Sequence, residues 1–525
     1  MTKTAPNRKR RIIVNNDFYN IFQVAPPVTD ADVYAAVDKL AGTQVDTLAL
    51  MIDSFNAGGE PMIHPDLARL YAHPDTDPCI HSLAEFRRAG KDPFGMLVKR
   101  AKKAGLEFLA SIRMNDTHYK DHIYHPWMDA FYYDHLDDRV GEGGSRGGAE
   151  YDYRKTIVRD YYFDQIRKTV ERYEVDGVEL DMTRNCMFFP RGTDASGHTE
   201  ECAPVMTEFI RRVRALLDEW GGKRKRRLVL SVVVPYSLYR CRLEGLDVPL
   251  WGRLGYLDML CMSTPFLADF DRDIADARLK IPGVPVYAGC DRNVAFRMGG
   301  GRVVPLQTYR AMAMNYLAQG ADGTYLYNVM SWTMNLERPM PESLKDMGGQ
   351  GETDGAPLDY DRNLLQEVGD LSTLNHLDKL YLVSQGAGAP DKPLGALPVT
   401  VPAGGETTIR FSIGDDVLSA EQAGRLKRIE LQTISSDCSD YNRYTVKLNG
   451  IDLSRQYAFM PYAKRPDTVL LFPEPGRKGI LPEPDHVRRH PVRPIDLHRG
   501  INAVTIRSYG PALTITDIEL AIRYR

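Results

Sequence analysis

Eight short stretches rich in branched apolar residues alternate with helical patterns along the first two-thirds of the chain, and this order limits the fold more than any other feature. The expected strands are residues 11–17, 45–55, 106–116, 175–185, 227–236, 257–265, 284–291 and 323–332. Helices are expected between several of them, at residues 30–41, 94–105, 154–173, 204–220 and 306–321. Strands that alternate with helices form parallel sheets, and eight such units fit a closed (β/α)8 barrel, the TIM barrel.

An open, doubly wound sheet is the main alternative to the barrel. Such sheets usually carry a glycine-rich phosphate-binding turn after the first strand, and no such turn follows residues 11–17. The barrel is therefore preferred. The segments 56–93, 117–153 and 333–357 are much longer than the usual connection of about five residues. In a barrel they would build walls around a cleft at the carboxyl ends of the strands.

A chain of 525 residues exceeds the usual size of one hydrophobic core, so at least two domains are expected. Glycine and proline cluster at residues 384–393, and short stretches with alternating apolar residues follow them. We therefore predict a catalytic barrel at residues 1–384. An all-β jelly-roll sandwich is predicted at residues 385–525.

The charge balance argues against nucleic acid and membrane surfaces as partners, because the net charge is only −3. The seven cysteines are scattered and never form a CxxC pair, which indicates reduced thiols rather than disulfides or a zinc site. No apolar run approaches the length of a membrane span, and no signal-type apolar region follows the basic residues 8–11. We expect a soluble, cytoplasmic protein as given; a leader removed earlier and a homo-oligomer are both compatible with the sequence.

The stretch 175–185, Val-Asp-Gly-Val-Glu-Leu-Asp-Met-Thr-Arg-Asn, is the most informative for function. Val178 and Leu180 alternate with Glu179 and Asp181, so a strand here has one apolar face and one face with two carboxylates. The carboxyl ends of barrel strands are where ligands bind. The stretch therefore predicts acidic groups at a binding cleft.

Two segments resemble known families. The run from Tyr173 to Arg184, Tyr-Glu-Val-Asp-Gly-Val-Glu-Leu-Asp-Met-Thr-Arg, resembles the fourth-strand signature of the bacterial family-10-like glycosyl hydrolases, with Glu-Leu-Asp-Met where they carry paired aspartates. The resemblance implies hydrolysis of glycosidic bonds at the barrel mouth. Residues 446–450, 497–507 and 518–520 resemble the jelly rolls of the galactose-binding type, which implies an accessory domain of a carbohydrate enzyme.

Hydrolysis of a glycosidic bond generally uses two carboxyl groups that flank it. The candidates are the acids at strand ends, Asp17, Asp53, Asp116, Asp181 and Asp291. Strands four and seven face each other across a barrel mouth, so Asp181 and Asp291 are the predicted catalytic pair. Under the alternative interpretation, Asp291 caps a turn and Asp53 pairs with a basic neighbour.

Glu179 lies two residues deeper than Asp181 on the same face of its strand. It is kept among the catalytic candidates, but an interior carboxylate needs a partner. Arg113 on the neighbouring strand occupies an alternate position whose side chain is expected to point into the barrel. We therefore favour a buried ion pair between Glu179 and Arg113 that positions Asp181.

The segment after the third strand concentrates histidines and aromatic residues, including His118, His122, His125 and His135. Aromatic faces and imidazoles suit a saccharide subsite; an ordinary packed surface loop is the alternative. His118 and His122 beside Asp116 also have the spacing of metal ligands in barrel deacetylases. A metal-dependent carbohydrate deacetylase is thus one alternative function.

Further candidates lie at or just past strand ends, where polar and aromatic groups recognise sugars. The predicted substrate-binding residues are Asn16, Asp53, Arg113, Asn115, Asp116, His118, Arg184, Asn185, Tyr236, Asn328 and Trp332; taken singly, most of them are equally expected as caps or loop contacts. The basic run 223–227 is expected to be a solvated turn. The leading hypothesis is a glycoside hydrolase for a poly- or oligosaccharide, without cofactor or metal. A non-catalytic carbohydrate-binding protein on a degenerate barrel is the remaining alternative.

Overall fold

The fold is that of a computed structural model. It describes residues 8–22, 27–52, 78–117, 130–141, 148–190, 199–264, 268, 270, 272–290, 293–294, 302–303, 305–328, 358–383, 397–435, 444–453 and 486–525. The chain divides into two compact units. Unit 1 is Met1–Pro265, Asp273–Gly289 and Ala321–Leu365, and unit 2 is Phe266–Arg272, Cys290–Gly320 and Gln366–Arg525. The predicted boundary at residue 384 falls at the edge of a range outside the described residues and stays a prediction.

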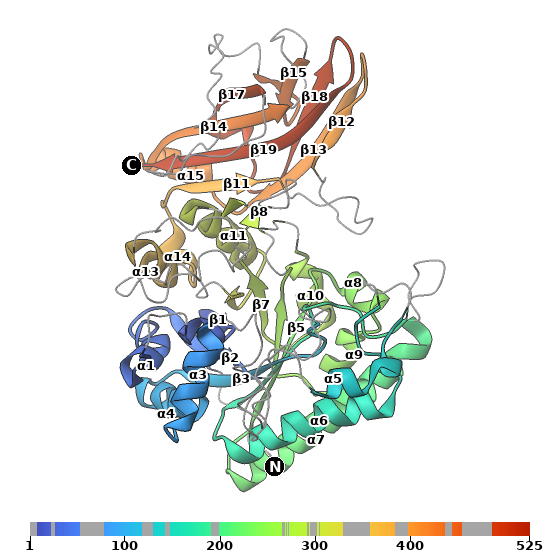
Figure 1. The fold of residues 1–525 in the computed structure, drawn as a ribbon. Helices are drawn as coiled ribbons and strands as arrows, with labels where there is room; N and C mark the ends of the chain where they lie inside the picture. The colour runs from blue at the N-terminus through green and yellow to red at the C-terminus, as the bar shows by residue number, and fades with distance from the viewer. Residues whose placement is uncertain are drawn as a thin grey trace. The chain divides into compact units, whose positions relative to one another are not determined.

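Unit 1 is a closed barrel of eight parallel strands in the order β1-β10-β7-β6-β5-β4-β3-β2 (Figure 1). The strands are β1 (Ile12–Asn16), β2 (Val45–Met51), β3 (Glu107–Arg113), β4 (Gly177–Asp181), β5 (Val229–Val234), β6 (Met259–Met262), β7 (Val286–Gly289) and β10 (Gly323–Leu326). Each lies inside one of the eight predicted stretches. The predicted fold class, a TIM barrel followed by an all-β sandwich, is confirmed, and the jelly-roll form of that sandwich stays a prediction.

Helices of unit 1 connect the strands, and α4 shows how the sequence can set their ends. They are α1 (Asp30–Asp38), α3 (Pro78–Arg88), α4 (Pro93–Ala104), α5 (Ala130–Asp134), α6 (Thr156–Arg172), α7 (Thr199–Lys223), α8 (Leu238–Leu243), α9 (Val248–Arg253) and α10 (Ile274–Lys280), with the 3-10 turns η1 (Tyr19–Phe22) and η3 (Leu136–Asp138). In α4, the Asp92 side chain accepts from the Gly95 amide, Pro93 opens the helix, and Gly105 ends it in the left-handed conformation.

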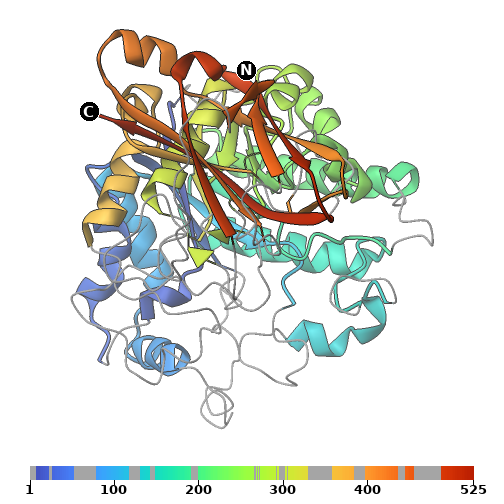
Figure 2. The ribbon, with the colours of Figure 1, turned by 90° about the horizontal axis from the view of Figure 1, so that it is seen from above.

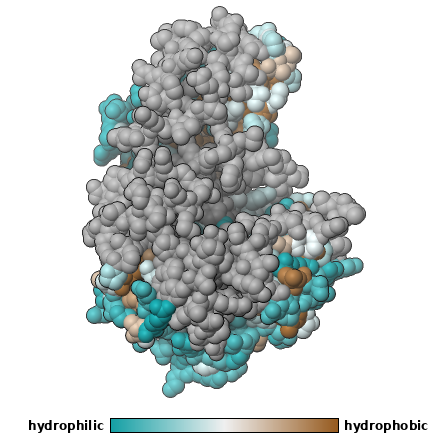
Figure 3. Space-filling model, viewed as in Figure 1, coloured by the Kyte–Doolittle hydropathy of each residue, from teal (hydrophilic) through white to brown (hydrophobic). Residues whose placement is uncertain are grey.

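The outer surface over α6 and α7 is mainly hydrophilic (Figure 3). Ion pairs such as Arg167 with Asp164 and Glu171 lie along α6. In the described part of the chain, no helix combines the length and the apolar character that crossing a membrane requires.

The amino end of the barrel is closed by a buried ion pair. Arg10 donates from Nε and Nη2 to the two carboxylate oxygens of Glu107, at 2.6 and 2.7 Å, and Thr47 donates to Glu107 Oε2 at 2.8 Å. Bidentate pairs of this kind fix the orientation of both side chains. Arg10, Thr47 and Glu107 therefore satisfy one another at the amino end of the barrel.

The prediction of a solvated turn for the basic run 223–227 is wrong. Arg224 donates to the backbone carbonyls of Val170 and Tyr173, at the end of α6, and Arg226 pairs with Asp176 just before β4. The carbonyls at a helix end have no partners within the helix, so arginine side chains satisfy them. The run clamps the turn that leads into β4.

We predict that Arg224→Ala lowers the free energy of unfolding by about 1–2 kcal/mol, because two backbone carbonyls lose a charged donor. Urea unfolding followed by circular dichroism measures the change. Lys225→Gln, at an exposed position in the same turn, is the control and should change the value by less than about 0.5 kcal/mol. Equal effects of the two substitutions would contradict the clamp.

Unit 2 contains two antiparallel sheets, with the orders β11-β19-β14-β17 and β13-β18-β15-β16, and β12 pairs with β19. Its strands are β11 (Lys379–Leu382), β12 (Val399–Val401), β13 (Glu406–Ile413), β14 (Leu426–Ser435), β15 (Tyr444–Leu448), β16 (Ile451–Asp452), β17 (His486–Val492), β18 (Gly500–Ser508) and β19 (Leu513–Tyr524), with a small ribbon of β8 (Asn293–Val294) and β9 (Arg302–Val303). Strand β19, deep red in Figure 2, ends beside the C-terminus.

Unit 2 also includes α11 (Leu306–Ala318), α14 (Leu371–Leu374), α15 (Val417–Gln422) and the 3-10 turn η6 (Pro494–Asp496), while α13 (Leu358–Glu367) bridges the division between the units in sequence. Lys379 is fully buried and donates to Asp415 at 3.1 Å and to the carbonyl of Leu374 at 2.7 Å. Tyr381 and Tyr524 donate to the same carboxylate. Burial lowers the pKa of Lys379, and these partners stabilise its charge.

Candidate active site

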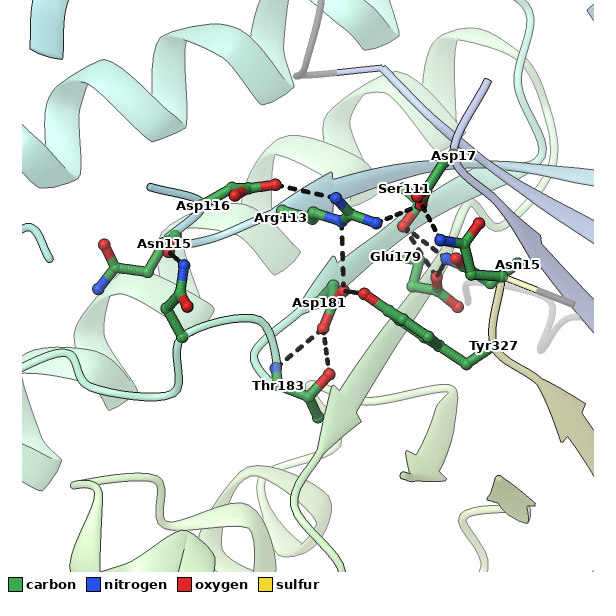
Figure 4. A network of polar contacts seen from close by, with 12 residues as sticks. Asn15, Asp17, Ser111, Arg113, Asn115, Asp116, Glu179, Asp181, Thr183 and Tyr327 are labelled. Atoms are coloured by element: carbon green, nitrogen blue, oxygen red, sulfur yellow. Dashed lines mark hydrogen bonds and ion pairs between the residues drawn. The ribbon is translucent and has the colours of Figure 1, made fainter. Parts of the chain in front are cut away.

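Asp181 is the last residue of β4, and its carboxylate is held from two sides (Figure 4). Oδ1 accepts from the Thr183 amide at 2.8 Å and from the Thr183 hydroxyl at 2.6 Å. Oδ2 accepts from the Tyr327 hydroxyl at 3.1 Å, and Arg113 Nε lies 3.9 Å from it. The side chain is fully buried. Oδ2 therefore keeps more capacity to accept another group than Oδ1.

Arg113, the last residue of β3, joins several carboxylates at this end of the barrel. Its guanidinium pairs with Asp17 just after β1 and with Asp116 just after β3, the latter at 2.9 Å. Burial by itself lowers the pKa of Arg113, but Asp17 and the other nearby anionic groups outweigh it and hold the pKa well above its usual value. Arg113 and Asp116, both predicted site residues, are thus brought together with Asp181.

Glu179 lies one layer deeper in the barrel, and its partners differ from our prediction. Its Oε1 accepts from Asn15 at 2.9 Å, from Ser111 at 2.9 Å and from Tyr325 at 3.0 Å. The predicted ion pair with Arg113 is wrong. In the parallel register Ser111 lies beside Glu179, while Arg113 lies beside Asp181.

Glu179 is fully buried, and its pKa is raised to about 7. Burial is the largest cause, the negative charge of Asp181 adds to it, and the donors to Oε1 act against it. Oε2 of Glu179 has no hydrogen-bond partner among the described residues. At pH values below about 7 this side chain therefore exists largely as the neutral acid.

The eighth barrel strand, β10, and the residue just after it supply two tyrosines that the sequence analysis missed. Tyr325 and Tyr327 occupy alternate positions and donate to Glu179 and Asp181, respectively. Burial raises the pKa of both hydroxyls, which keeps them as donors at neutral pH. Asn328, a predicted site residue, donates to Asp17. The alternation in residues 323–328 indicates that the two tyrosines share one face, but it does not indicate that they donate to acids.

On β1 the interior position belongs to Asn15, which donates to Glu179 and, at 3.2 Å, to Ser111. Neighbouring residues of a strand point to opposite faces. Asn16 therefore faces away from the interior, and its side-chain oxygen accepts from the Phe18 amide at 2.8 Å. The Asn16 side chain therefore stabilises the turn after β1 and does not line the interior at the mouth of the barrel.

Asn115 and Asn185 hold loops together. Asn115 donates to the carbonyl of Met187 at 2.5 Å and accepts from the Tyr151 amide at 2.8 Å. Asn185 donates to the carbonyl of Asn115 at 3.1 Å and to the Thr117 hydroxyl at 3.2 Å. These bonds fix the segments that follow β3 and β4 beside Asp181, so both side chains already have a structural role.

The remaining candidates are only partly visible. Arg184 and Tyr236 are half-buried just after β4 and β5. Asp53, His118, His122, Asp291 and Trp332 lie outside the described residues, and their roles stay predictions. Within the described ranges, no group of three or more His, Cys, Asp and Glu residues could hold a metal ion.

The described end of the histidine-rich segment packs against the barrel helices. Phe131 stacks on Tyr161, with ring centroids 4.0 Å apart, and on His135 at 4.1 Å. Tyr132 is fully buried and meets Tyr151 edge to face. These aromatic faces contact one another, which favours the packed-loop alternative for residues 130–135.

Comparisons with known proteins find similarity in structure alone. No family model matches the sequence, and no curated protein matches it. A cycloisomaltooligosaccharide glucanotransferase from Paenibacillus sp. is 10% identical at a TM-score of 0.34; the match covers 97% of this chain and 57% of that one. The PgaB (BpsB) glycoside hydrolase domain from Bordetella bronchiseptica is 11% identical at a TM-score of 0.38, over 63% of this chain and 96% of that domain. An Anoxybacillus alpha-amylase is 12% identical at a TM-score of 0.37, and the match covers 95% of this chain and 98% of that one.

These neighbours are glycoside-active enzymes. Their identities and TM-scores are too low to carry an argument about the activity or the residues of this chain. The resemblances to the family-10-like hydrolases and to the galactose-binding jelly rolls stay predictions. The functional argument therefore depends on the site itself.

Proposed function

We propose that this chain is a glycoside hydrolase that cleaves a poly- or oligosaccharide with a pair of carboxyl groups at the barrel mouth. One observation carries the proposal: Asp181 ends a barrel strand with Oδ1 fixed by two donors of Thr183, while Oδ2 meets Tyr327 and, at a longer distance, Arg113 among the residues that the structure describes. A carboxylate held in one orientation is positioned to attack an anomeric carbon or to activate a water molecule.

Each neighbour of Asp181 has a part in this mechanism. Thr183 and Tyr327 hold the plane of the Asp181 carboxylate. The carboxylate therefore loses little orientational freedom when substrate binds. Arg113 places positive charge beside Oδ2 and is itself held by Asp17 and Asp116. The second carboxyl group, the proton donor to the leaving oxygen, is assigned to Asp291 as a prediction from strand order.

The test is a screen of neutral and acidic poly- and oligosaccharides in which released reducing ends and released acetate are both measured. The proposal expects new reducing ends from at least one substrate, with full activity after chelator treatment. Acetate release that a chelator abolishes would instead identify the metal-dependent deacetylase. Saccharide binding without any product would identify the non-catalytic binding protein.

A further inference from the structure

Glu179 has a hydrogen-bond pattern that fits a neutral acid better than an ion. Three donors converge on Oε1, at 2.9, 2.9 and 3.0 Å, while the buried Oε2 has no partner among the described residues. An ionised carboxylate shares its charge between both oxygens and needs donors on both, because a buried charge without partners is costly. In a neutral acid, Oε1 is the carbonyl oxygen that accepts and Oε2 carries the proton.

Among the described residues, the groups that face Glu179 offer no positive charge to compensate an ion. Glu179 faces polar groups from around the ring of strands: Asn15 on β1, Ser111 on β3, Asp181 on β4 itself, Ser231 on β5, Cys261 on β6 and Tyr325 on β10. None of these side chains is a cation, and Asp181 is an acid. Arg113, one layer above, is engaged by Asp17 and Asp116.

A contrast within the same barrel supports this assignment. Glu107, at the amino end, is a buried glutamate whose two oxygens both receive donors from one guanidinium, that of Arg10. It has the partners that an ionised carboxylate requires. Glu179 has the opposite pattern although both side chains lie in the barrel interior.

We infer that Glu179 is a positioning residue that stays protonated in the working enzyme and keeps the floor of the site uncharged beneath Asp181. The part that concerns the reaction rests on the proposed function. Ionisation of Glu179 places a second negative charge two residues from Asp181 and competes for Arg113. Like charges at this spacing oppose each other, so the fixed arrangement around Asp181 is lost and activity falls as the pH rises.

The first test measures stability and needs no activity. The pKa of Glu179 rises from 4.5 to about 7 on folding, so the proton stabilises the native state fully below pH 4.5, and this contribution is lost as the pH rises to about 7. Glu179→Gln keeps the neutral form at every pH. From pH 4.5 to about pH 8, the unfolding constant of the wild type should increase relative to that of the variant on the order of 10²-fold.

A control variant and a second measurement accompany this test. Glu107→Gln leaves Arg10 buried without its anion, so it should destabilise the protein even at neutral pH, where Glu179→Gln should not. If Glu179→Gln does not fold, infrared spectra of wild-type protein with isotope-labelled glutamate replace the variant. The band of a buried protonated glutamic acid should be present at pH 6 and should lose about half its intensity near pH 7. A constant stability difference, or the absence of that band, would overturn the inference.

The second test uses the pH dependence of turnover on any substrate that the screen identifies. The wild type should lose activity with an apparent pKa near 7, and Glu179→Gln should retain activity through that range. If the variant keeps the wild-type profile, Glu179 is not the controlling group. If no substrate is cleaved, the proposed function fails while the stability and infrared results still decide the state of Glu179.

Discussion

Replacing Asp181 by asparagine is expected to reduce turnover on the order of 10³-fold or more, the range observed when a reacting carboxylate or nucleophile is removed. Asparagine has the same shape, its side-chain oxygen can still accept from Thr183, and its amide can donate to the Tyr327 oxygen. The contacts that hold the residue at the end of β4 are therefore kept. What is lost is the negative charge of the carboxylate.

The measurement is reducing-end release by wild type and variant, together with saccharide binding and urea unfolding. Binding and unfolding should change little. Asp137→Asn, at an exposed position in η3 of the same unit, is the control and should keep full turnover. Unchanged turnover in the Asp181 variant would remove this residue from the reaction and with it the proposal.

Removing the Arg113 guanidinium by Arg113→Met is expected to lower the free energy of unfolding by about 3–5 kcal/mol, the cost of breaking a buried ion pair from one side. The side chains of Asp17 and Arg113 are at most 7% exposed. Without the guanidinium, the Asp17 carboxylate therefore has little access to water. Asp116 and Asp181 lose the same cation. The methionine fills much of the arginine volume, which keeps the cavity contribution small.

The expected loss can be separated from the general effect of an arginine substitution. Arg211→Met breaks the pair with Glu208 on α7, where both side chains are more than half exposed, and should cost less than about 1 kcal/mol. Adding Asp17→Asn to Arg113→Met should restore part of the stability, because the buried and unpaired negative charge of Asp17 is removed. Similar losses in the two single variants would contradict the role of Arg113 as the centre of the network.

The sequence was sufficient for the architecture because each barrel strand is a short apolar stretch bounded by turn residues. It also placed Asp181 correctly, since the alternation Val178, Glu179, Leu180, Asp181 sets which face carries the acids. It failed on the partner of Glu179. Inward parity selects several residues of β3, and only the register between β3 and β4 decides that Ser111, not Arg113, is its neighbour.

The contribution of β10 was equally hard to foresee. Nothing in the local pattern of Tyr325 and Tyr327 separates a packed aromatic from a hydrogen-bond donor to an acid 146 residues earlier. The basic run 223–227 was misjudged for a related reason. Its arginines satisfy carbonyls at the end of α6, and charge content alone does not indicate that such acceptors are nearby.

Some of the donors to the two acids of β4 lie on β1 or at the end of β10, far from the acids in sequence. Asn15 reaches Glu179 across 164 residues of sequence, and Asn328 reaches Asp17 across 311. During synthesis the acids of β4 therefore emerge long before the tyrosines that orient them. A nascent or truncated chain that stops before residue 323 carries these acids without Tyr325 and Tyr327, so the hydrogen bonds that orient the acids form only when the last barrel strand has been made.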